Sequence, residues 1–549
     1  MYRSVFSFIF LVCTLLLRVP AFAQTGYVPL NDQFSNNLTG KLYNKNFRFH
    51  TSIRPYNYRE IEKVVNVDSL RSAQRRNRVF AKSWKQKVWD KLFNDDAISL
   101  YKKDFTIQAN PLMNFSAGYD ATHHKKTWVN TRGFEIKGTL GKGLVFYTRF
   151  YENQAVFPEY LSNYVKDNLV VPGQGRIHVL LDNTGQHYYL DGKAFDYSMA
   201  DGYVAWQTGK YVSFQFGHGK NFYGDGYRSL LLSDNSTANL FFKFSLDVWH
   251  LKYQVLLNQY LDIRDSTMTG GYARKFSAIH YLSWAISKRV SLSLFDAVVW
   301  SATDNQGQYR GFDFQYLNPM IFLRPVEFSI GSPDNALVGF NMSVIVGDHN
   351  VLYGQLLLDE FNLKNVLYHR GYWTNKQAVQ LGFKAYDLFK IKNLYFQTEF
   401  NNVPPYTYSE REEIINYGAY NQPLADPFGA NFRESVNFLR YNYKRFYFSY
   451  ELLYSIYGTD PPGKNYGGDI YKSYLNHVSD YGNYIGQGIR NRLLYQDIRA
   501  SYLINPRYNL NFTLGAVFRN LQTEGVGTTN TAYIYFGIRT SLRNLYYDF

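Results

Sequence analysis

A glycine-rich segment with closely spaced charges and aromatic rings is the part of the sequence best suited to chemistry. It is FGHGKNFYGDGYRSLLLSDN, residues 216–235. Its charged side chains offer strong hydrogen bonds, its tyrosines offer flat faces for stacking, and its glycines permit tight backbone paths. These properties suit a glycan ligand, and they suit equally a loop that folds inward and pairs its charges with the protein. The candidate glycan contacts are Lys220, Tyr223, Asp225, Tyr227, Arg228 and Asp234.

Other kinds of site have little support in the residue pattern. Gly217 and Gly219 lack the third glycine and the following helix of a dinucleotide site. Ser229 and His218 are close in sequence, but no nucleophile elbow or carboxylate pair accompanies them. The sequence therefore predicts no cofactor, no metal site and no enzyme activity. The histidines are scattered and lack metal-ligand spacing: His123, His124, His178, His187, His218 and His250.

The N-terminus predicts an exported protein. An apolar run follows Arg3, and Ala21-Phe22-Ala23 then supplies the small residues that signal peptidase recognises, so we expect a signal peptide over residues 1–23. Cys13 is the only cysteine, which excludes a disulfide scaffold and a Cys-based zinc site. The chain has a formal net charge of +15 and stays basic after cleavage. Because an exported chain meets glycans and lipids first, we expect no nucleic-acid partner.

Residues 57–104 have the pattern of an amphipathic, basic helix. Phe80, Trp84, Val88 and Leu92 recur every four residues, and Asn94-Asp95-Asp96 breaks the pattern. The other face carries many cations and one acid, Asp90. A solvated face on a helix packed against the protein explains this charge, and so does contact with anionic lipid head groups or an acidic partner.

From about residue 105 to the end, the apolar period changes to two. The 51 Tyr and 43 Phe of the chain favour strands, and Phe134, Ile136 and Leu140 alternate with polar residues. Such segments have the length of tilted membrane strands, roughly 9 to 11 residues. After the N-terminus no apolar run reaches about 18 residues, which excludes helical membrane spans.

The predicted connections between strands alternate in length. Nine long loops and eight short turns require eighteen strands, and long-short alternation is typical of outer-membrane barrels. The short turns are near 141–143, 209–210, 249–250, 287–289, 347–350, 386–391, 443–445 and 505–507. The long loops are near 119–131, 152–199, 219–238, 261–272, 301–336, 361–375, 402–432, 457–490 and 519–530.

These patterns predict an all-β protein, an outer-membrane antiparallel β-barrel of about 18 strands. Closure of the sheet would satisfy every backbone group within the bilayer. We expect the barrel over residues 105–549 and a small N-terminal periplasmic helical element over 24–104. Ile534, Phe536 and Ile538 alternate near the end, and Phe549 resembles the last residue of the terminal strand that the assembly machinery recognises. Phe536 and Phe549 have opposite parity, which predicts an irregular end.

The segment 216–235 resembles the glycine-rich loop of the capsule assembly protein Wzi family. In that family a strand ends in a glycine turn, and an aromatic-Gly pair and Ser-Leu-x-Leu-Ser-x-Asn follow. Partial similarities are Leu317-Asn318-Pro319, Tyr353–Leu356 with Asp359, and Pro423–Phe432. The resemblance covers roughly residues 105–549. It implies an eighteen-stranded outer-membrane barrel with periplasmic helices that holds capsular polysaccharide as a lectin. The Tyr-rich strands resemble the variants of gliding bacteria, including gliding-motility protein RemB.

We therefore expect an outer-membrane protein that binds or organises capsular or other surface polysaccharide without catalysis. One alternative is an accessory protein of gliding motility or adhesion, in which residues 57–104 bind a periplasmic partner. Another is a porin-like channel, since an eighteen-stranded barrel is wide enough for water unless it is blocked.

Overall fold

The computed structural model describes most of the chain. The described residues are 26–66, 75–77, 79, 83–141, 143–178, 180–181, 187–188, 194–264, 271–304, 307–331, 334–360, 364 and 370–549. The predicted signal peptide lies outside them. Within these residues, no helix has both the length and the apolar character that crossing a membrane requires.

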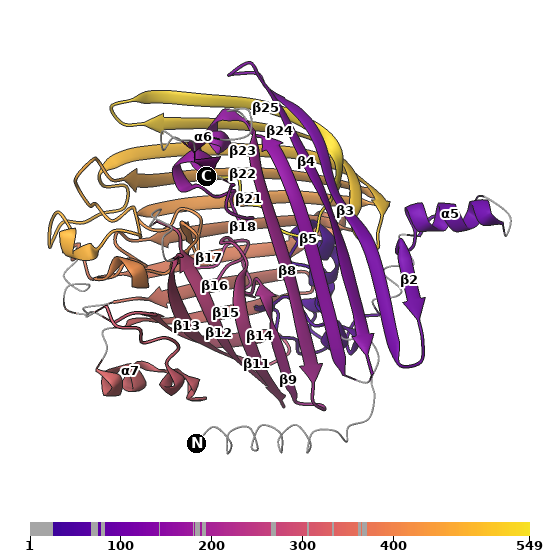
Figure 1. Cartoon of the computed structure of the whole chain (residues 1–549), viewed down its shortest axis with the longest axis horizontal. Coiled ribbons are helices and arrows are strands. Elements are labelled where there is room, and N and C mark those ends of the chain that lie inside the picture. Colours follow the sequence, from indigo (N-terminus) through magenta and orange to yellow (C-terminus); the bar gives the residue numbers. More distant parts are fainter. Residues whose placement is uncertain are drawn as a thin grey trace.

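Eighteen antiparallel strands form one closed barrel, as predicted (Figure 1). The barrel closes where the last strand pairs with the first, with Tyr533 opposite Asp120 and Arg539 opposite Asn114. The strands are β3 (Phe105–Asp120), β4 (Lys125–Leu140), β5 (Leu144–Val156), β8 (Phe195–Gln207), β9 (Val212–Gly219), β11 (Asn239–Val248), β12 (Leu251–Asp262), β13 (Ala273–Trp284), β14 (Val290–Ser301), β15 (Asn335–Val346), β16 (Asn350–Leu358), β17 (Gln377–Tyr386), β18 (Leu394–Val403), β21 (Phe432–Tyr443), β22 (Phe446–Thr459), β23 (Ile489–Asn505), β24 (Leu510–Thr523) and β25 (Gly527–Thr540).

Many strands place apolar side chains outside and polar ones inside, although β12 to β15 also turn apolar side chains inward against the lumen contents. On β24, Phe512 and Leu514 are exposed on the outer surface, whereas Asn511 and Thr513 are buried in the interior. This arrangement is the reverse of a water-soluble barrel and is typical of a barrel surrounded by lipid. The period of two in the sequence thus encodes which face meets lipid.

The connections differ in length between the two rims. We call the end with the eight short turns the turn rim and the opposite end the loop rim. Two of the long loops predicted at the loop rim, near 119–131 and 519–530, are wrong. The structure has tight hairpin connections there, over residues 121–124 and 524–526, because β3, β4, β24 and β25 continue through the polar residues. Strands that extend beyond the lipid carry polar side chains and resemble loops in sequence.

Short elements occupy the long connections and some turns. They are α6 (Glu159–Asn168), β6 (Leu180–Leu181), β7 (His187–Tyr188), β10 (Phe222–Tyr223), η1 (Phe314–Leu317), α7 (Arg324–Ile330), η2 (Leu388–Lys390), η3 (Glu413–Ile415), β19 (Gly418–Ala419), β20 (Gln422–Pro423) and η4 (Tyr474–Asn476).

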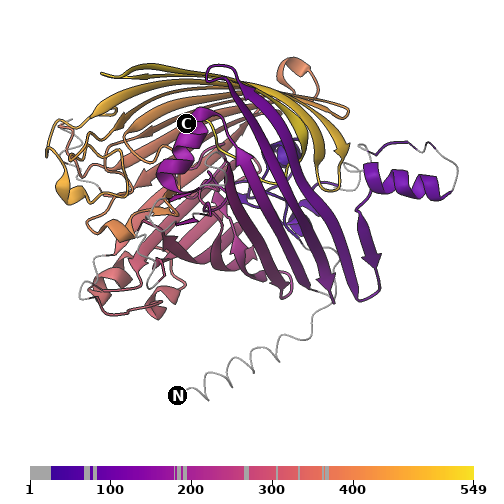
Figure 2. The same cartoon turned by 45° about the horizontal axis from the view of Figure 1, so that its top comes forward.

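Residues 26–66 lie inside the barrel. They contain α2 (Asp32–Leu42), β1 (Ile53–Arg54) and α3 (Tyr58–Glu62). Glu60 forms an ion pair of 2.5 Å with Lys252 on the inner wall, and the His50 ring nitrogen lies 2.9 Å from the Ser283 hydroxyl. Figure 2 shows these indigo residues enclosed by the strands. The N-terminal segment therefore fills part of the lumen.

The basic helix is shorter than the sequence pattern predicted. Of residues 57–104, the described part contains α3, α5 (Trp84–Phe93) and β2 (Ile98–Tyr101), which pairs with β3. The α5 helix ends before Asn94, as the polar break predicted. It lies outside the barrel beside the turn rim (Figure 1). Phe80 falls outside the described residues.

The C-terminal tail, residues 541–549, turns back into the lumen after β25. The Asn544 backbone NH donates to Leu30 O at 2.8 Å, and the Phe549 ring lies 4.5 Å from that of Tyr164 in α6. The expectation that the terminal strand reaches Phe549 is wrong, because pairing stops at Thr540. The opposite parity of Phe536 and Phe549 in the sequence predicts this irregular end. The tail runs from the turn rim to α6 at the loop rim.

Candidate functional site: a polar plug beneath an aromatic rim

The connection between β9 and β11 folds into the lumen and meets the N-terminal segment there. Ile53 of β1 pairs with Tyr223 of β10. The fold needs glycine at this point: Gly224 has φ of 153°, and a Cβ there would lie 2.4 Å from the Gln355 amide nitrogen. Leu230 and its two leucine neighbours are buried. The segment is therefore an internal plug, which we call the lumen loop (residues 220–238).

Tyr223 of the lumen loop is fully buried against the barrel wall. Its ring stacks on Tyr281 of β13 with centroids 4.4 Å apart, and its hydroxyl donates to Gln254 at 3.1 Å. The ring is thus closed to solvent. The tyrosine attaches the loop to the wall by stacking and one hydrogen bond.

Asp225 links the lumen loop to the N-terminal segment. Its carboxylate accepts hydrogen bonds from the Tyr43 and Thr51 hydroxyls, each at 2.6 Å, and from the Asn341 amide at 2.8 Å. Lys384 donates to the backbone oxygen of the same residue. A buried carboxylate with this many donors is satisfied without a charged ligand.

Arg228 is the centre of a buried ion cluster. Its guanidinium lies 2.8 Å from Asp548 in the tail, 3.3 Å from Glu434 on β21 and 3.7 Å from Asp426. Burial raises the pKa of Asp426 above its ordinary value, so a proton is favoured within this group of three acids around one cation. The cluster ties together the lumen loop, the wall and the tail.

Lys220 and Asp234 form a second group at the ends of the lumen loop. The Lys220 ammonium donates to Gly173 O at 2.6 Å and to Asp234 O at 2.8 Å, and burial lowers its pKa to about 8. Burial raises the pKa of the Asp234 carboxyl, which accepts a 2.6 Å hydrogen bond from the Tyr546 hydroxyl. The Tyr227 hydroxyl donates to Asp548 at 3.2 Å.

The structure thus brings the six candidate contacts together, inside the barrel. Their described polar partners are protein groups on the wall, the N-terminal segment, the tail, the lumen loop itself and two of the long connections. The inward fold with paired charges, one of the two interpretations of the loop, is the arrangement observed. A direct contact of these six residues with a glycan stays a prediction. Sequence reasoning missed Glu434 and Asp548, whose distance along the chain hides their role.

A group of half-buried aromatic rings with one exposed member, Tyr481, lies at the loop rim above the lumen loop. It joins the β16–β17 and β22–β23 connections, because the Trp373 backbone NH donates to Asp480 O at 3.0 Å. Trp373 stacks on His477 with centroids 4.5 Å apart, and Tyr481 is 47% exposed. We call this group the rim platform; its members are Tyr372, Trp373, Tyr474, His477 and Tyr481. The concentration of tyrosine in the predicted loop 457–490 is the sequence signal for it.

Solved structures with the same barrel exist, although no family model and no curated protein match the sequence. One is Wzi, an outer-membrane protein involved in group 1 capsule assembly in Escherichia coli and described as a carbohydrate-binding β-barrel. It is 12% identical with a TM-score of 0.52, and the match covers 94% of this chain and 99% of that chain. The chain has the fold of an outer-membrane barrel.

Two porin-type structures match less closely. OprD from Pseudomonas aeruginosa is 11% identical with a TM-score of 0.41, covering 81% of this chain and 97% of that chain. OpdK with vanillate, also from Pseudomonas aeruginosa, is 9% identical with a TM-score of 0.42, covering 78% and 97%.

Proposed function

We propose that this protein is a non-catalytic lectin of the outer membrane that binds or organises cell-surface or capsular polysaccharide at its loop rim. The observation that carries the proposal is a lumen occupied by residues 26–66, the lumen loop and the tail, under a rim that presents aromatic rings. Flat aromatic faces with polar tips suit sugar rings, which combine apolar C–H faces with hydroxyl groups. A filled lumen favours binding over transport.

Two further points support polysaccharide as the ligand. The barrel is similar over nearly its whole length to Wzi, whose description names carbohydrate binding and capsule assembly. The segment 216–235 also resembles the corresponding loop of the Wzi family, and we propose a distant relationship to that family. Roles in gliding motility or adhesion, and a periplasmic partner for residues 57–104, stay predictions.

Within this proposal the six lumen residues support the binding surface from beneath. The Arg228 cluster fixes Asp426 and hence the connection between β18 and β21, which reaches the loop rim. Lys376, next to the platform, lies 4.3 Å from the Tyr474 ring and donates to Ser409 O in that connection at 3.1 Å. The lumen loop thus supports the rim platform through Asp426 and the β18–β21 connection.

The proposal is tested by binding of the detergent-solubilised full chain to an array of bacterial surface polysaccharides. We expect the double variant Trp373→Ala, Tyr481→Ala to bind its best polysaccharide about tenfold more weakly, because loss of each ring removes about 0.5–1.5 kcal/mol of stacking. Tyr211→Ala is the matched control, since Tyr211 is half exposed at the turn rim. Absence of binding by the wild type, or equal binding by the double variant, contradicts the proposal.

A further inference from the structure

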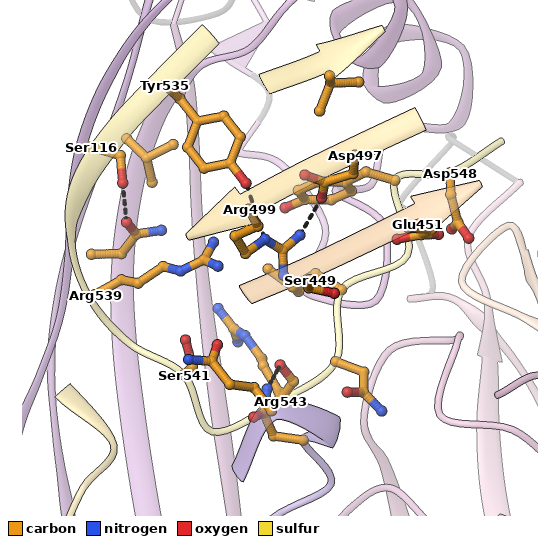
Figure 3. A pocket seen from close by; sticks show the side chains of 18 of the residues that line it. Ser116, Ser449, Glu451, Asp497, Arg499, Tyr535, Arg539, Ser541, Arg543 and Asp548 are labelled. Atoms are coloured by element: carbon orange, nitrogen blue, oxygen red, sulfur yellow. Dashed lines mark hydrogen bonds and ion pairs between the residues drawn. The ribbon is translucent and has the colours of Figure 1, made fainter. Parts of the chain in front are cut away.

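A cavity of about 210 Å³ lies in the lumen between the tail and the inner wall. One buried water needs only about 10–15 Å³ of such space, so a ligand of several heavy atoms fits. The lining runs from Asn31 near the turn rim to Tyr160 near the loop rim. Figure 3 shows side chains of β22, β23, β25 and the tail around this space. The cavity is polar and elongated along the barrel.

Most of the charges around the cavity are paired. Arg440 lies 3.4 Å from Asp32, and Asp548 takes part in the Arg228 cluster. Arg499 forms an ion pair with Asp497, and its Nε donates to the Tyr535 hydroxyl at 3.2 Å. Asp32, Asp497 and Asp548 are therefore committed to cations of the protein, whereas the buried Oε1 of Glu451, which also lines the cavity, has no hydrogen-bond partner among the residues that the structure describes.

Two arginines on the cavity have no carboxylate partner in the described part of the chain. Arg543 donates to the neutral Gln174 amide oxygen at 2.7 Å and contacts the Met199 sulfur. Arg539 has a buried Nε without a hydrogen-bond partner. Figure 3 shows both beside Arg499, which is already paired. Partly buried cations without a counter-ion at ion-pair distance favour an anionic ligand.

The neutral groups around the arginines favour a hydroxylated ligand. The Tyr533 and Tyr535 rings stack with centroids 5.4 Å apart, and the Ser541 and Thr540 side chains line the same cavity. A guanidinium binds a carboxylate through two parallel hydrogen bonds, which favours a planar carboxylate. Hydroxyl groups and tyrosine rings suit a sugar ring attached to it.

We propose that this cavity binds the carboxylate of a sugar acid, a single uronic acid unit, between Arg539 and Arg543. The inference rests on the proposed function and deepens it, because it predicts that the bound polysaccharide contains acidic sugar units. The carboxylate replaces the missing counter-ion of both guanidinium groups, and the sugar ring lies against the tyrosines. Inorganic phosphate shares the anionic chemistry, and the experiment separates the two.

The test is calorimetric titration of the detergent-solubilised full chain with glucuronate, glucose and inorganic phosphate in turn. We expect glucuronate to bind and glucose not to bind. Arg539→Gln and Arg543→Gln each weaken glucuronate binding at least tenfold, whereas Arg539→Lys retains part of it. Arg289→Gln, at an exposed position of the turn rim, is the matched control and leaves binding unchanged. Unchanged melting temperatures show that the variants fold.

Equal binding of glucose, equal glucuronate affinity in the folded arginine variants, or binding of phosphate without glucuronate overturns this inference. The rim platform variant separates it from the proposed function. If Trp373→Ala, Tyr481→Ala loses polysaccharide but still binds glucuronate, both proposals hold. If the wild type binds polysaccharide but no glucuronate, only the cavity proposal fails. If it binds glucuronate but no polysaccharide, the proposed function fails and the cavity remains an anion site.

Discussion

At the scale of single residues, the lumen is organised by buried charges whose partners come from distant parts of the chain. Arg228 meets carboxylates from β21 and the tail, and Asp225 meets hydroxyl groups of the N-terminal segment. Removing one partner of such a group leaves a buried charge, which is strongly destabilising. Each of these residues therefore holds several segments in register at once.

Lys220 gives this organisation a measurable pH dependence. Its pKa in the folded protein, about 8, lies below the ordinary value of 10.5. Between these pH values the unfolded chain binds more protons, so stability rises as pH increases from 8 to 10.5. We expect a contribution of about 1 kcal/mol after allowance for partial exposure of the side chain. Lys220→Met removes this rise.

Thermal unfolding in detergent micelles between pH 7 and pH 10.5 measures the effect. Lys288→Met, at an exposed site in the turn between β13 and β14, is the control and keeps the rise. An identical pH profile for Lys220→Met and the wild type refutes the prediction.

At the scale of elements, α5 has an exposed apolar stripe where the sequence pattern predicted one. Trp84 is 71% exposed and Leu92 is 53% exposed, whereas Phe93 lies under the Arg76 guanidinium at 4.3 Å. The helix also carries Lys85 and Lys87. An amphipathic helix with lysines and an exposed tryptophan, beside the turn rim of a lipid-facing barrel, suits the membrane interface.

We expect α5 to lie in the periplasmic leaflet with Trp84 in contact with lipid. In nanodiscs that contain anionic phosphatidylglycerol, brominated lipid should quench part of the tryptophan fluorescence, and Trp84→Phe should lose a measurable part of that quenching. Trp300→Phe, in the buried core, is the control and leaves the amount of fluorescence that the brominated lipid quenches unchanged. Equal quenching in Trp84→Phe and the wild type means that the stripe faces water or protein.

The strands were predictable because lipid outside and polar lumen inside impose a strict alternation. The hairpins at 121–124 and 524–526 were not, because strands beyond the lipid lose their apolar face. The position of residues 26–66 was also hidden: a segment that fills a polar lumen has the composition of a water-soluble helix bundle. The residue types of the lumen loop were recognised, but their burial depends on Tyr43, Glu434 and Asp548, which no local pattern connects.

At the scale of the whole molecule, the segments described inside the barrel include residues 26–66, the lumen loop and the tail, of which the tail is the shortest. Its aromatic end packs on α6 and on Phe157 just before it: the Tyr547 ring lies 6.4 Å from the Phe157 ring, and the Phe549 ring lies 4.5 Å from that of Tyr164 in α6. These ring contacts, together with the ion pair between Asp548 and Arg228, hold the end of the tail. Eighteen strands enclose enough space for a water-filled channel when the contents are removed.

We expect the full chain to show almost no conductance in a planar bilayer, and a variant truncated after Thr540 to conduct. Tyr547→Ala, Phe549→Ala keeps β25 intact and should show intermittent channel openings, since the anchoring rings and the hydrogen bond from Gln174 to the Tyr547 hydroxyl are lost. Tyr309→Ala, at an exposed rim position outside the tail, is the control and stays closed. Steady conductance of the wild type supports the porin-like alternative, and closed variants show that the tail does not block the lumen.

The inward course of the tail also determines how the molecule can be handled. Any polypeptide joined after Phe549 starts within the cylinder, next to the Arg519 side chain that donates to Phe549 O at 3.0 Å. A fused reporter or affinity label at that position has to displace the tail or emerge beside α6. Labels inserted in the β14–β15 connection, near the exposed Tyr309, leave the interior undisturbed.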